Sequence, residues 1–321
     1  MPGITGMATT YNLPQYASEL FSVSVEDTPL LSAIGGLRGA VSTGATFFEW
    51  QTYDLRDADE NRQRLEGAEA PDGEERVRST HRNVLEIHQE AIELSYTRQA
   101  ITSQAYVPDG EKTIKIGNSI IPVSEFQWQI DQALKQIARD VDKGFIVGKQ
   151  QIPTDNTKPR KTGGLIEAIK TNVVAGSGAL TEDMVLDTFQ KAWESGGIQE
   201  TATRTILVGP TMRRQLTKVF ADRVSRSSAT PNIVGGVTMD TIATDFGNAN
   251  IMVDRYMPAD TMLVVSLGEL KPVFLDIPGK GHFFVEPLAK TGAADKVQMY
   301  GEIGLNYGSE LHHAKLTVAK A

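Results

Sequence analysis

The sequence predicts an α+β fold, with strands concentrated toward both ends of the chain and helices in its middle. Three observations support this class: the aromatic and β-branched run from Ala45 to Tyr53, a long amphipathic helix that begins at Ser124, and an almost unbroken series of strand-like segments after Gly236. Because 40% of the 321 residues are hydrophobic and 22% are charged, the chain can bury a sizeable core.

The N-terminal part predicts an arm followed by a long hairpin. Residues 1 to 44 hold one apolar cluster, TPLLSAIGGLRGA, which predicts a short helical or turn segment in an otherwise extended arm. The segments Ala45 to Tyr53 and Arg82 to Thr97 both alternate and are predicted to form the two legs of the hairpin. The apolar residues change parity within the second leg, which predicts a bulge or bend near Gln89.

The far end of this hairpin is an unusually charged insert, Asp54 to Arg78. Nine acids and six arginines, with no lysine, are interleaved between Asp54 and Arg82. Composition alone favours a disordered, solvated loop. Arginine, however, pairs with carboxylates in a planar, multidentate geometry, and a hairpin of this length is marginal alone in water. The insert is therefore also typical of a surface that lies on a neighbouring copy.

The clearest helix is SEFQWQIDQALKQIARDVDKGF. Ser124 and Gln127 form a capping-box pattern, and about 22 residues at a 1.5 Å rise give a length of about 33 Å. Apolar residues at steps of three and four predict a buried stripe along this spine helix, made of Phe126, Ile130, Leu134, Ile137 and Val141.

The remaining elements predict an α/β region followed by strands. A polar loop near 150 to 165 precedes a helix capped by Thr181 and ended by Gly196 and Gly197. The strand TILVG leads into a helix with Pro210 at its first position. The strand-like segments after Gly236 are VTMDTIAT, NANIMVDRYM, TMLVVSL, KPVFLD, HFFVEPL, DKVQMYGEIGLNYG and ELHHAKLTVA.

Composition excludes several kinds of site. The net charge of −8 argues against retention of nucleic acid through bulk positive charge. A chain without cysteine cannot use disulfides, thiolate catalysis or cysteine-ligated metals. No run of about 18 apolar residues predicts a membrane span, so no membrane partner is expected.

Motifs give no catalytic site, no cofactor and no metal site. Pro278 to His282 has the Gly-Lys pair of a phosphate loop but lacks the upstream glycine and the hydroxyl residue. Glu310, His312 and His313 are expected to be structural, because adjacent residues on a strand point to opposite faces and only one histidine could join the glutamate. Carboxylates are plentiful, but their spacing singles out no acid–base pair.

Three segments carry a family likeness: TTYNLPQYASELFSVSVEDTPLLSAIGG, TATRTILVGPTMRRQLTKVF and TMDTIATDFGNANIMVDRYMPADTMLVVSLGELKPVFLD. Together with the order of arm, charged hairpin, spine helix, α/β region and returning strands, they resemble the major capsid proteins of tailed bacteriophages, which have the Hong Kong 97-type fold. More narrowly, the chain is similar to the major head protein family that includes the coliphage SU-10 type.

The resemblance implies five parts of the chain. They are an N-terminal arm (1–44), an extended loop (45–97, with its tip at about 54–80), a peripheral domain (98–165, with the spine helix at 124–148), an axial domain (166–275) and returning strands that complete the peripheral domain (276–321).

The implied function is structural and not enzymatic: self-assembly into the icosahedral head shell that encloses double-stranded DNA. Expected partners are other copies of the chain, in hexamers and pentamers, and separate scaffold, portal and decoration or cement proteins. The DNA would be enclosed without sequence-specific binding. The implied location is the virion capsid, with the host cytoplasm as the site of assembly.

The extended loop would supply the contacts between subunits. These residues are Arg56, Asp57, Arg62, Arg64, Glu66, Glu69, Glu74, Arg76 and Arg78. The type member of the fold cross-links its subunits through a lysine in this loop, and here the loop has none, so that isopeptide bond is not expected. The short segment before Thr46 also predicts that any scaffold is a separate protein.

Three alternatives stay open at this point. An encapsulin-like nanocompartment shell would share the fold but load protein cargo in place of a genome. An α+β hydrolase or transferase with an unrecognised carboxylate site would belong to a different class. A tail-tube or adhesin subunit would form rings or fibres.

Overall fold

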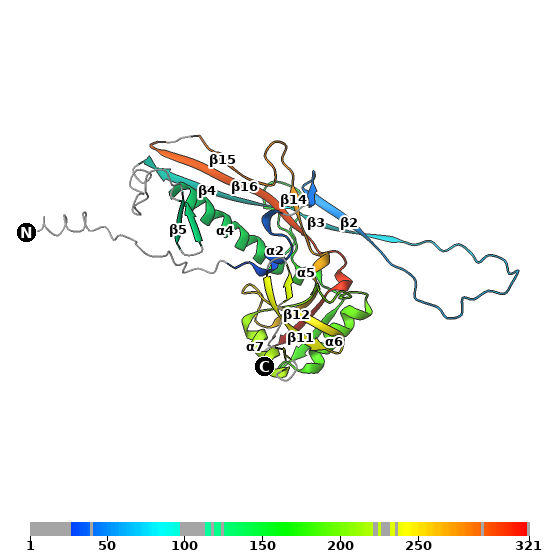
Figure 1. Ribbon diagram of the computed structural model, residues 1–321. Coiled ribbons are helices and arrows are strands. Elements are labelled where there is room, and N and C mark those ends of the chain that lie inside the picture. The colour runs from blue at the N-terminus through cyan, green and yellow to red at the C-terminus, as the bar shows by residue number, and fades with distance from the viewer. Residues whose placement is uncertain are drawn as a thin grey trace, which may run out of the picture. The chain divides into compact units, whose positions relative to one another are not determined.

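The computed structural model describes residues 27–38, 41–96, 113–116, 119–122, 125–220, 224–225, 232–234, 237–289 and 292–319. These residues form two compact units. One unit is drawn from His88–Asp140 and Phe283–Gly301, and the other from Pro29–Ile87, Val141–His282 and Glu302–Ala321. Helix α4 (Glu125–Val147) and strand β16 (Ala294–Asn306) contribute residues to both units (Figure 1). The five-part division implied by the resemblance stays a prediction.

An eight-stranded mixed sheet forms a large part of the second unit. Its strands follow the order β10 (Asn232–Val234), β11 (Val237–Thr244), β12 (Gly247–Val253), β8 (Arg204–Val208), β13 (Thr261–Ser266), β17 (Ala314–Ala319) and β7 (Val173–Ser177), and β9 (Val224–Ser225) pairs with β11. The pairs β12–β8 and β17–β7 are parallel, whereas the other neighbours in this order are antiparallel.

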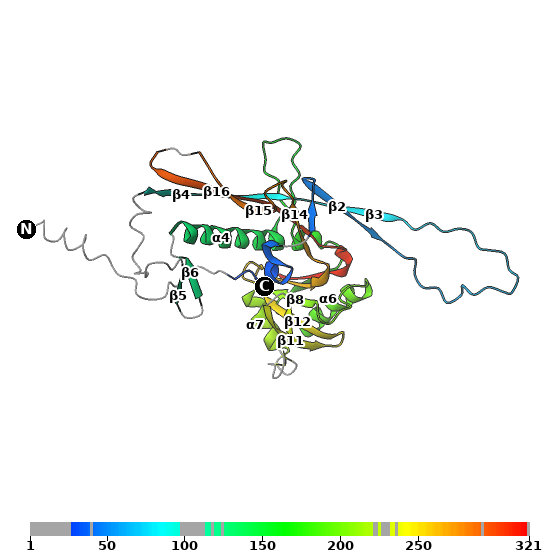
Figure 2. The same ribbon diagram turned by 45° about the horizontal axis from the view of Figure 1, so that its top comes forward.

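Two helices pack on one face of this sheet, α6 (Glu182–Glu194) and α7 (Pro210–Val219), as Figure 2 shows beside β8 and β12. Alternate residues of β8, Ile206 and Val208, share a buried cluster with Phe189 of α6 and Leu216 of α7. All five residues of β8 are buried, so this central strand is covered on both faces.

The predicted ends of these helices are confirmed. The Thr181 hydroxyl accepts a hydrogen bond from the Met184 amide at 3.3 Å, and Gly196 follows α6 with a φ of +83° that glycine adopts without a steric penalty. Pro210 occupies the first turn of α7, where its missing N–H costs nothing. Short helical turns also occur at α5 (Leu165–Ala168) and η2 (Leu267–Glu269).

The first unit contains strands that pair around β16. Strand β15 (Phe283–Pro287) runs antiparallel to Val297–Gly301 of β16, and β4 (Glu86–Ser95) also pairs with β16. Polar side chains join these strands, since Lys296 lies 3.4 Å from Glu93 and the amide of Gln89 donates to Gln298 at 2.7 Å. Strands β5 (Thr113–Ile116) and β6 (Ser119–Pro122) form a separate antiparallel hairpin.

The spine helix is present as α4, but its buried stripe differs from the prediction. Ile137 and Val141 are buried as expected, whereas Ile130 is only partly buried. Leu134 is 41% exposed, so its assignment to the core is wrong. Ala133, at 8% exposed, occupies the covered position at this level of the helix. Ser124 and the side chains of Phe126 and Gln127 lie outside the described residues.

The long hairpin is present in a shorter form than predicted. Strands β2 (Phe47–Tyr53) and β3 (Arg78–Val84) pair antiparallel from Phe47↔Val84 to Tyr53↔Arg78. The predicted second leg divides at Leu85, after which β4 pairs with β16. The expected bend near Gln89 is therefore wrong: Gln89 lies within β4, and the parity of the apolar residues misleads because Ile87 is 47% exposed.

The remaining short elements can be compared with those that the sequence predicts. The short helix expected in the arm is α2 (Pro29–Ala33), followed by η1 (Gly36–Arg38), while residues 1–26 lie outside the described residues. Strand β1 (Val41–Thr43) is parallel to β14 (Lys271–Leu275), which in turn pairs with β16. The last predicted strand starts late, because Glu310–His312 forms the 3₁₀ turn η3 and pairing begins at Ala314.

Candidate functional site

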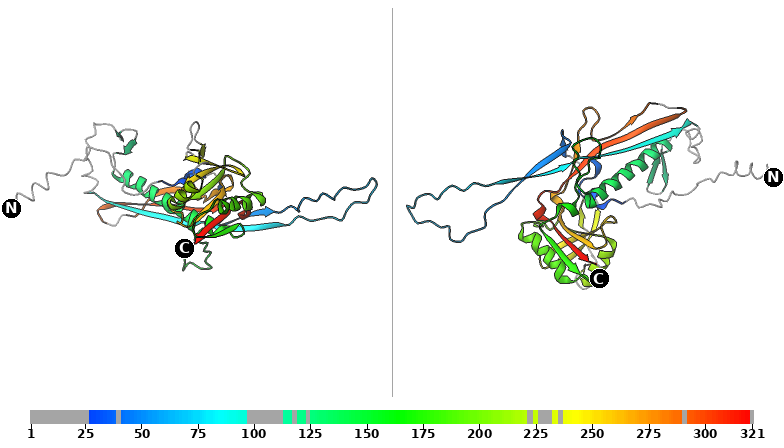
Figure 3. Two further views of the ribbon diagram at one scale, coloured as in Figure 1. Left: turned by 90° about the horizontal axis from the view of Figure 1, so that it is seen from below. Right: turned by 180° about the vertical axis from the view of Figure 1, so that it is seen from behind.

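The hairpin of β2 and β3 carries a loop that extends beyond both strands in all three ribbon views (Figures 1, 2 and 3). This segment, residues 54–77, is called the hairpin loop here, and every residue in it is exposed. A turn at its far end is closed by a hydrogen bond from the Ala68 amide to the Leu65 carbonyl, with Gly67 at a φ of +80°. That φ suits the third position of a type II turn, which favours glycine.

The two faces of β2 have different surroundings. Phe48 is buried against Leu85 and Val273, with Trp50 packed beside this cluster. The opposite face carries Phe47, which is 46% exposed, and Tyr53, which is 72% exposed. Alternation along a strand produces these two faces, so one face holds the hairpin to the second unit and the other meets solvent.

A glycine lets the hairpin base approach β16 closely. A Cβ atom added to Gly304 would lie 2.8 Å from the Phe48 ring and 2.8 Å from the Val84 carbonyl oxygen. Both distances are shorter than van der Waals contact, so a side chain at this position would force the hairpin away from β16.

Trp50 attaches the inner face of the hairpin to the turn that follows β16. Its indole Nε1 donates a hydrogen bond to the Gly308 carbonyl at 2.6 Å, and its ring meets that of Tyr307 edge to face at 4.8 Å. The Thr52 hydroxyl lies 2.9 Å from Nε2 of His81, whose ring is stacked near the indole. These contacts fix the direction in which the hairpin extends from the rest of the second unit.

Asn83 is the buried polar centre of the hairpin base. Its side-chain amide donates to the carbonyls of Leu305 at 2.7 Å and Gly163 at 3.1 Å. Its carbonyl oxygen accepts from the Gly163 amide at 2.9 Å and from the Gln150 side chain at 3.3 Å. The side chain is fully buried and uses both of its functions, as a buried amide must.

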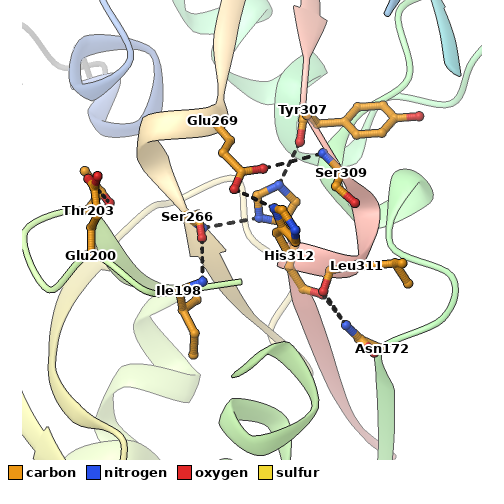
Figure 4. A network of polar contacts seen from close by, with 12 residues as sticks. Asn172, Ile198, Glu200, Thr203, Ser266, Glu269, Tyr307, Ser309, Leu311 and His312 are labelled. Carbon is orange, nitrogen blue, oxygen red and sulfur yellow. Dashed lines mark hydrogen bonds and ion pairs between the residues drawn. The ribbon is translucent and has the colours of Figure 1, made fainter. Parts of the chain in front are cut away.

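His313 contacts the same turn within a second set of polar groups, which includes Ser266, Glu269 and Tyr307 (Figure 4). The ring is completely buried; Nδ1 accepts from the Ser266 amide at 3.2 Å and Nε2 lies 2.8 Å from the Tyr307 carbonyl. Since an amide only donates and a carbonyl only accepts, these partners fix the neutral tautomer with the proton on Nε2. Burial lowers the pKa of His313, because the charged form would lose its hydration in this position.

His312 lies beside it but has a different environment. Its Nδ1 is 2.6 Å from Oε1 of Glu269, the contact drawn in Figure 4. The hydrogen bond to Glu269 raises the pKa of His312 despite partial burial. Desolvation alone would raise the pKa of Glu269, but the hydrogen bond and charge of His312 outweigh it and the pKa is lowered. We call the contacts of Trp50, His312, His313 and Glu269 around Asn306–Ser309 the junction.

The outer face of the hairpin holds one exposed ion pair and one hydrogen bond between side chains of the two strands. Arg82 lies 2.6 Å from Glu49 across the strands, and its guanidinium is 5.3 Å from the centre of the Phe47 ring. Arg78, which lies opposite Tyr53, donates diagonally to Gln51 at 3.3 Å. Such cross-strand pairs stabilise a hairpin by modest amounts.

Three arginines converge on one carboxylate in the hairpin loop. Glu74 forms ion pairs with Arg62, with Arg76 at 3.2 Å and with Arg56 at 3.8 Å. Desolvation acts to raise the pKa of Glu74, but hydrogen bonds and charge from Arg76 and Arg62 lower it overall. The cluster therefore gives the loop a shape without burying any of its members.

The structure brings together only part of the predicted contact set. Arg56, Arg62, Glu74 and Arg76 share the cluster, and Arg56 also donates to the Asp57 carbonyl at 2.7 Å. Arg78 belongs to β3 instead of the loop. The other predicted members, Arg64, Glu66 and Glu69, are exposed and have no ion pair among the described residues. Their role between subunits stays a prediction.

Sequence reasoning missed two anchoring residues, Asn83 and Glu269. Asn83 lies inside a predicted strand leg and Glu269 lies next to a predicted strand, so neither position stands out. Their partners are 80 or 222 residues away for Asn83 and 43 residues away for Glu269. The one sequence signal for them is a polar residue within or beside an apolar, strand-like segment.

The part of the chain that the structure describes contains neither a metal-binding cluster nor a membrane-spanning helix. No cluster of three or more His, Asp or Glu side chains there could hold a metal ion. None of the described helices combines the length and the apolar character needed to cross a membrane.

Comparison with curated proteins and solved structures finds phage capsid proteins. The chain is 28% identical over 134 residues to the major capsid protein of Escherichia phage Phieco32, an alignment that covers 42% of this chain and about a third, 32%, of that protein. Its fold is similar to the capsid asymmetric unit of cyanophage A-1(L), with 11% identity, a TM-score of 0.67 and 97% of each chain covered.

The same fold occurs in a compartment shell. The holo-SrpI encapsulin complex from Synechococcus elongatus has 11% identity and a TM-score of 0.56, with 98% of this chain and 94% of that chain covered. At such identities these structures show the fold alone, and they confirm the predicted α+β, Hong Kong 97-type class.

The family assignment comes from the whole length of the sequence. Residues 3–320 match the family described as SU10 major capsid protein, which agrees with the resemblance stated above. The chain therefore belongs to the SU10 major capsid protein family.

Proposed function

We propose that copies of this chain assemble into the icosahedral head shell of a tailed bacteriophage, and that the hairpin loop joins neighbouring copies. Membership of the SU10 major capsid protein family supports the shell. The proposed role is structural and not enzymatic, as befits a family of capsid proteins. The location that follows is the virion capsid, with assembly in the host cytoplasm.

One feature of the hairpin supports its role between copies. Its base is fixed by buried contacts at Trp50 and Asn83, whereas the 24 residues of the loop are all exposed. Leu65 is 86% exposed and Val77 is 76% exposed. Leu65 lies near the turn of the loop and Val77 directly before β3. A monomer gains nothing from holding these apolar side chains in water, whereas a neighbouring copy would cover them.

Weak contacts suit this role. Exposed ion pairs are worth about 0.2 to 1 kcal/mol each, so one contact forms and dissociates easily. A closed shell repeats each contact in every copy, and the sum becomes large while errors in assembly can still be reversed. We propose hexamers and pentamers as the closed arrangements.

The proposed contents are double-stranded DNA, enclosed without sequence-specific binding. The net charge of −8 supports a wall that does not grip DNA tightly. Separate scaffold, portal and decoration or cement proteins are proposed as further partners. Protein cargo in place of DNA would instead indicate an encapsulin-like compartment.

The test is assembly of the isolated chain, observed by negative-stain electron microscopy and size-exclusion chromatography. We expect closed shells, hexamers or pentamers from the natural sequence. Replacing Arg62, Arg64, Arg76 and Arg78 together by alanine should prevent assembly. A matched variant replaces exposed basic residues outside the hairpin, Lys170, Arg214, Lys218 and Lys271, and should assemble. A monomer under all conditions, with and without phage scaffold, would contradict the proposal.

A further inference from the structure

We propose that the acidic far end of the hairpin loop docks on a basic loop of a second copy, residues 149–161, called the lysine loop here. This inference rests on the proposed function and specifies the surface that receives the hairpin. Charge, exposed apolar residues and the reach of the hairpin support it.

The hairpin loop has an excess of unpaired negative charge. From Asp54 to Val77 it contains nine acids against four arginines, and three of those arginines are committed to Glu74. Beyond this cluster the far end holds Glu66 and Glu69 with Arg64 as the remaining cation, and all three are exposed. Its receiving surface must therefore be basic.

The lysine loop supplies the complementary charge. Lys149, Lys158 and Lys161 are exposed and have no ion pair among the described residues. The one acid within this loop, Asp155, is occupied by the amide of Thr157 at 3.1 Å and its hydroxyl at 2.5 Å. The basic groups of α4 alternate with acids, and Arg213 of α7 is paired with Asp240. Exposed lysines elsewhere, such as Lys218 and Lys271, are far apart in the sequence, whereas the lysine loop gathers three within residues 149–161.

The lysine loop is held in place at its base. Gln151 and Lys161 exchange backbone hydrogen bonds of 2.9 and 3.1 Å, which bring both ends of the loop together. Arg160 forms a 2.7 Å ion pair with Glu302, a buried carboxylate of β16. The lysines therefore project from a fixed frame, which lowers the entropy lost on docking.

The two loops also match in their apolar content. Leu65, at 86% exposed, lies beside Glu66, and Ile152, at 46% exposed, lies in the same loop as the lysines. An apolar contact surrounded by opposite charges is the usual composition of a specific interface.

A second copy is required because the hairpin loop extends away from its own lysine loop. The Gln150 side chain donates to the Arg82 carbonyl at 2.8 Å, which places the lysine loop near the base of β3. From Arg82 the strand runs to Arg78, about 13 Å at about 3.3 Å per residue, and the loop continues beyond that point in Figures 1 and 3. When each hairpin loop docks on the next copy, every copy also receives the hairpin loop of the copy before it. This arrangement can close into a ring.

A charge exchange tests the contact. Lys158→Glu with Lys161→Glu, or Glu66→Lys with Glu69→Lys, should each lower the assembled fraction at least tenfold in size-exclusion chromatography. The two pairs combined in one chain should restore assembly to within threefold of the natural sequence. Lys218→Glu with Lys271→Glu, a matched pair of exposed lysines elsewhere, should assemble normally. Thermal unfolding of each variant checks that it folds.

A disulfide tests proximity directly, because the chain has no cysteine of its own. Copies with Glu69→Cys, mixed with copies with Lys158→Cys and assembled under oxidising conditions, should give linked dimers on a non-reducing gel. Copies with Lys218→Cys in place of Lys158→Cys should not.

Two results would overturn the assignment. One is normal assembly of the lysine-reversed variant. The other is failure of the combined variant to assemble better than either reversal alone, which would mean that a separate protein or another face of the neighbour occupies the lysine loop. Shells formed by the natural sequence would leave the proposed function intact in both cases, so the two failures are distinguishable.

Discussion

The hairpin loop differs from the base of the hairpin, formed by Asn83 and the junction, in how it uses polar side chains. Glu74 and its arginines lie in water, with between 38% and 43% of each side chain exposed. Asn83 and His313 are fully buried and each hydrogen bond has a defined donor and acceptor. Exposed pairs contribute little to stability and can exchange partners, whereas unmade buried hydrogen bonds are costly.

The difference assigns stability to one region and recognition to the other. The junction and Asn83 connect the hairpin base to distant parts of the second unit, including Gly163 and Leu305. The loop makes its ion pairs within itself, so substitutions there should spare the fold. Substitutions at the base should therefore change the free energy of unfolding, and substitutions in the loop should change assembly.

The largest expected effect is that of Asn83→Asp. A carboxylate cannot donate to the Leu305 and Gly163 carbonyls that the amide now serves, and it would place charge in a fully buried position. We expect the free energy of unfolding to fall by about 3 kcal/mol or more, measured by urea denaturation at neutral pH.

Asn61→Asp is the matched control, because Asn61 is exposed in the hairpin loop. The same chemical change there should alter the free energy of unfolding by less than about 0.5 kcal/mol. Equal losses from the two variants would remove the distinction between base and loop.

Trp50→Phe should have an intermediate effect. Phenylalanine keeps an aromatic ring against Tyr307 but loses the hydrogen bond from Nε1 to the Gly308 carbonyl. We expect a loss of about 1 to 2 kcal/mol in chemical denaturation. Tyr53 on the opposite face is 72% exposed, so Tyr53→Phe should leave the free energy of unfolding unchanged. An unchanged Trp50→Phe variant would mean that the indole hydrogen bond does not stabilise the hairpin base.

Sequence periodicity predicted the elements whose partners lie nearby. The spine helix, the cap at Thr181 and the start of α7 at Pro210 all follow from local patterns and are confirmed. The same patterns also gave the order of these elements along the chain, which is part of the family resemblance. Local preference and global fold agree in these segments, which is why they could be found without a structure.

Long-range contacts decided what the sequence could not predict. The second hairpin leg divides at Leu85 because β3 pairs with β2 and β4 pairs with β16, a partner about 200 residues away. Leu134 has the spacing of a core residue, but periodicity does not reveal which positions of the helix other elements cover. Asn83 and Glu269 gain their importance from partners that no local pattern contains.

The two histidines of the junction should give stability opposite dependences on pH. The pKa of His313 is lowered in the folded state, so its contribution is present above the unfolded pKa of about 6.5 and is lost as the pH falls below it. The pKa of His312 is raised, so its contribution is present below about 6.5 and is lost as the pH rises through the folded pKa. The two contributions are lost on opposite sides of about pH 6.5, so the natural sequence should be most stable near that pH and less stable toward pH 5 and toward pH 8.

Single variants separate the two contributions. His312→Gln leaves the His313 term, so the free energy of unfolding should decrease as the pH falls from 7 to 5. His313→Gln leaves the His312 term, so it should decrease as the pH rises from 6 to 8. Denaturation at a series of pH values measures both slopes. Identical slopes in the two variants would contradict the assigned tautomer and ion pair.

The smallest effect on stability is expected from Glu74→Gln, and it is the sharpest test of the comparison. The substitution removes the carboxylate shared by Arg56, Arg62 and Arg76, all of them exposed, so the midpoint of unfolding should not move. The loop would lose the cluster that shapes it, and three arginines would repel one another, so the yield of assembled particles should fall severalfold at low salt. High salt should reduce the difference in yield between the variant and the natural sequence. It screens the attraction between Glu74 and the arginines in one, and the repulsion among the arginines in the other. A variant that unfolds more easily but assembles normally would mean that the loop belongs to the folded unit and that recognition lies elsewhere.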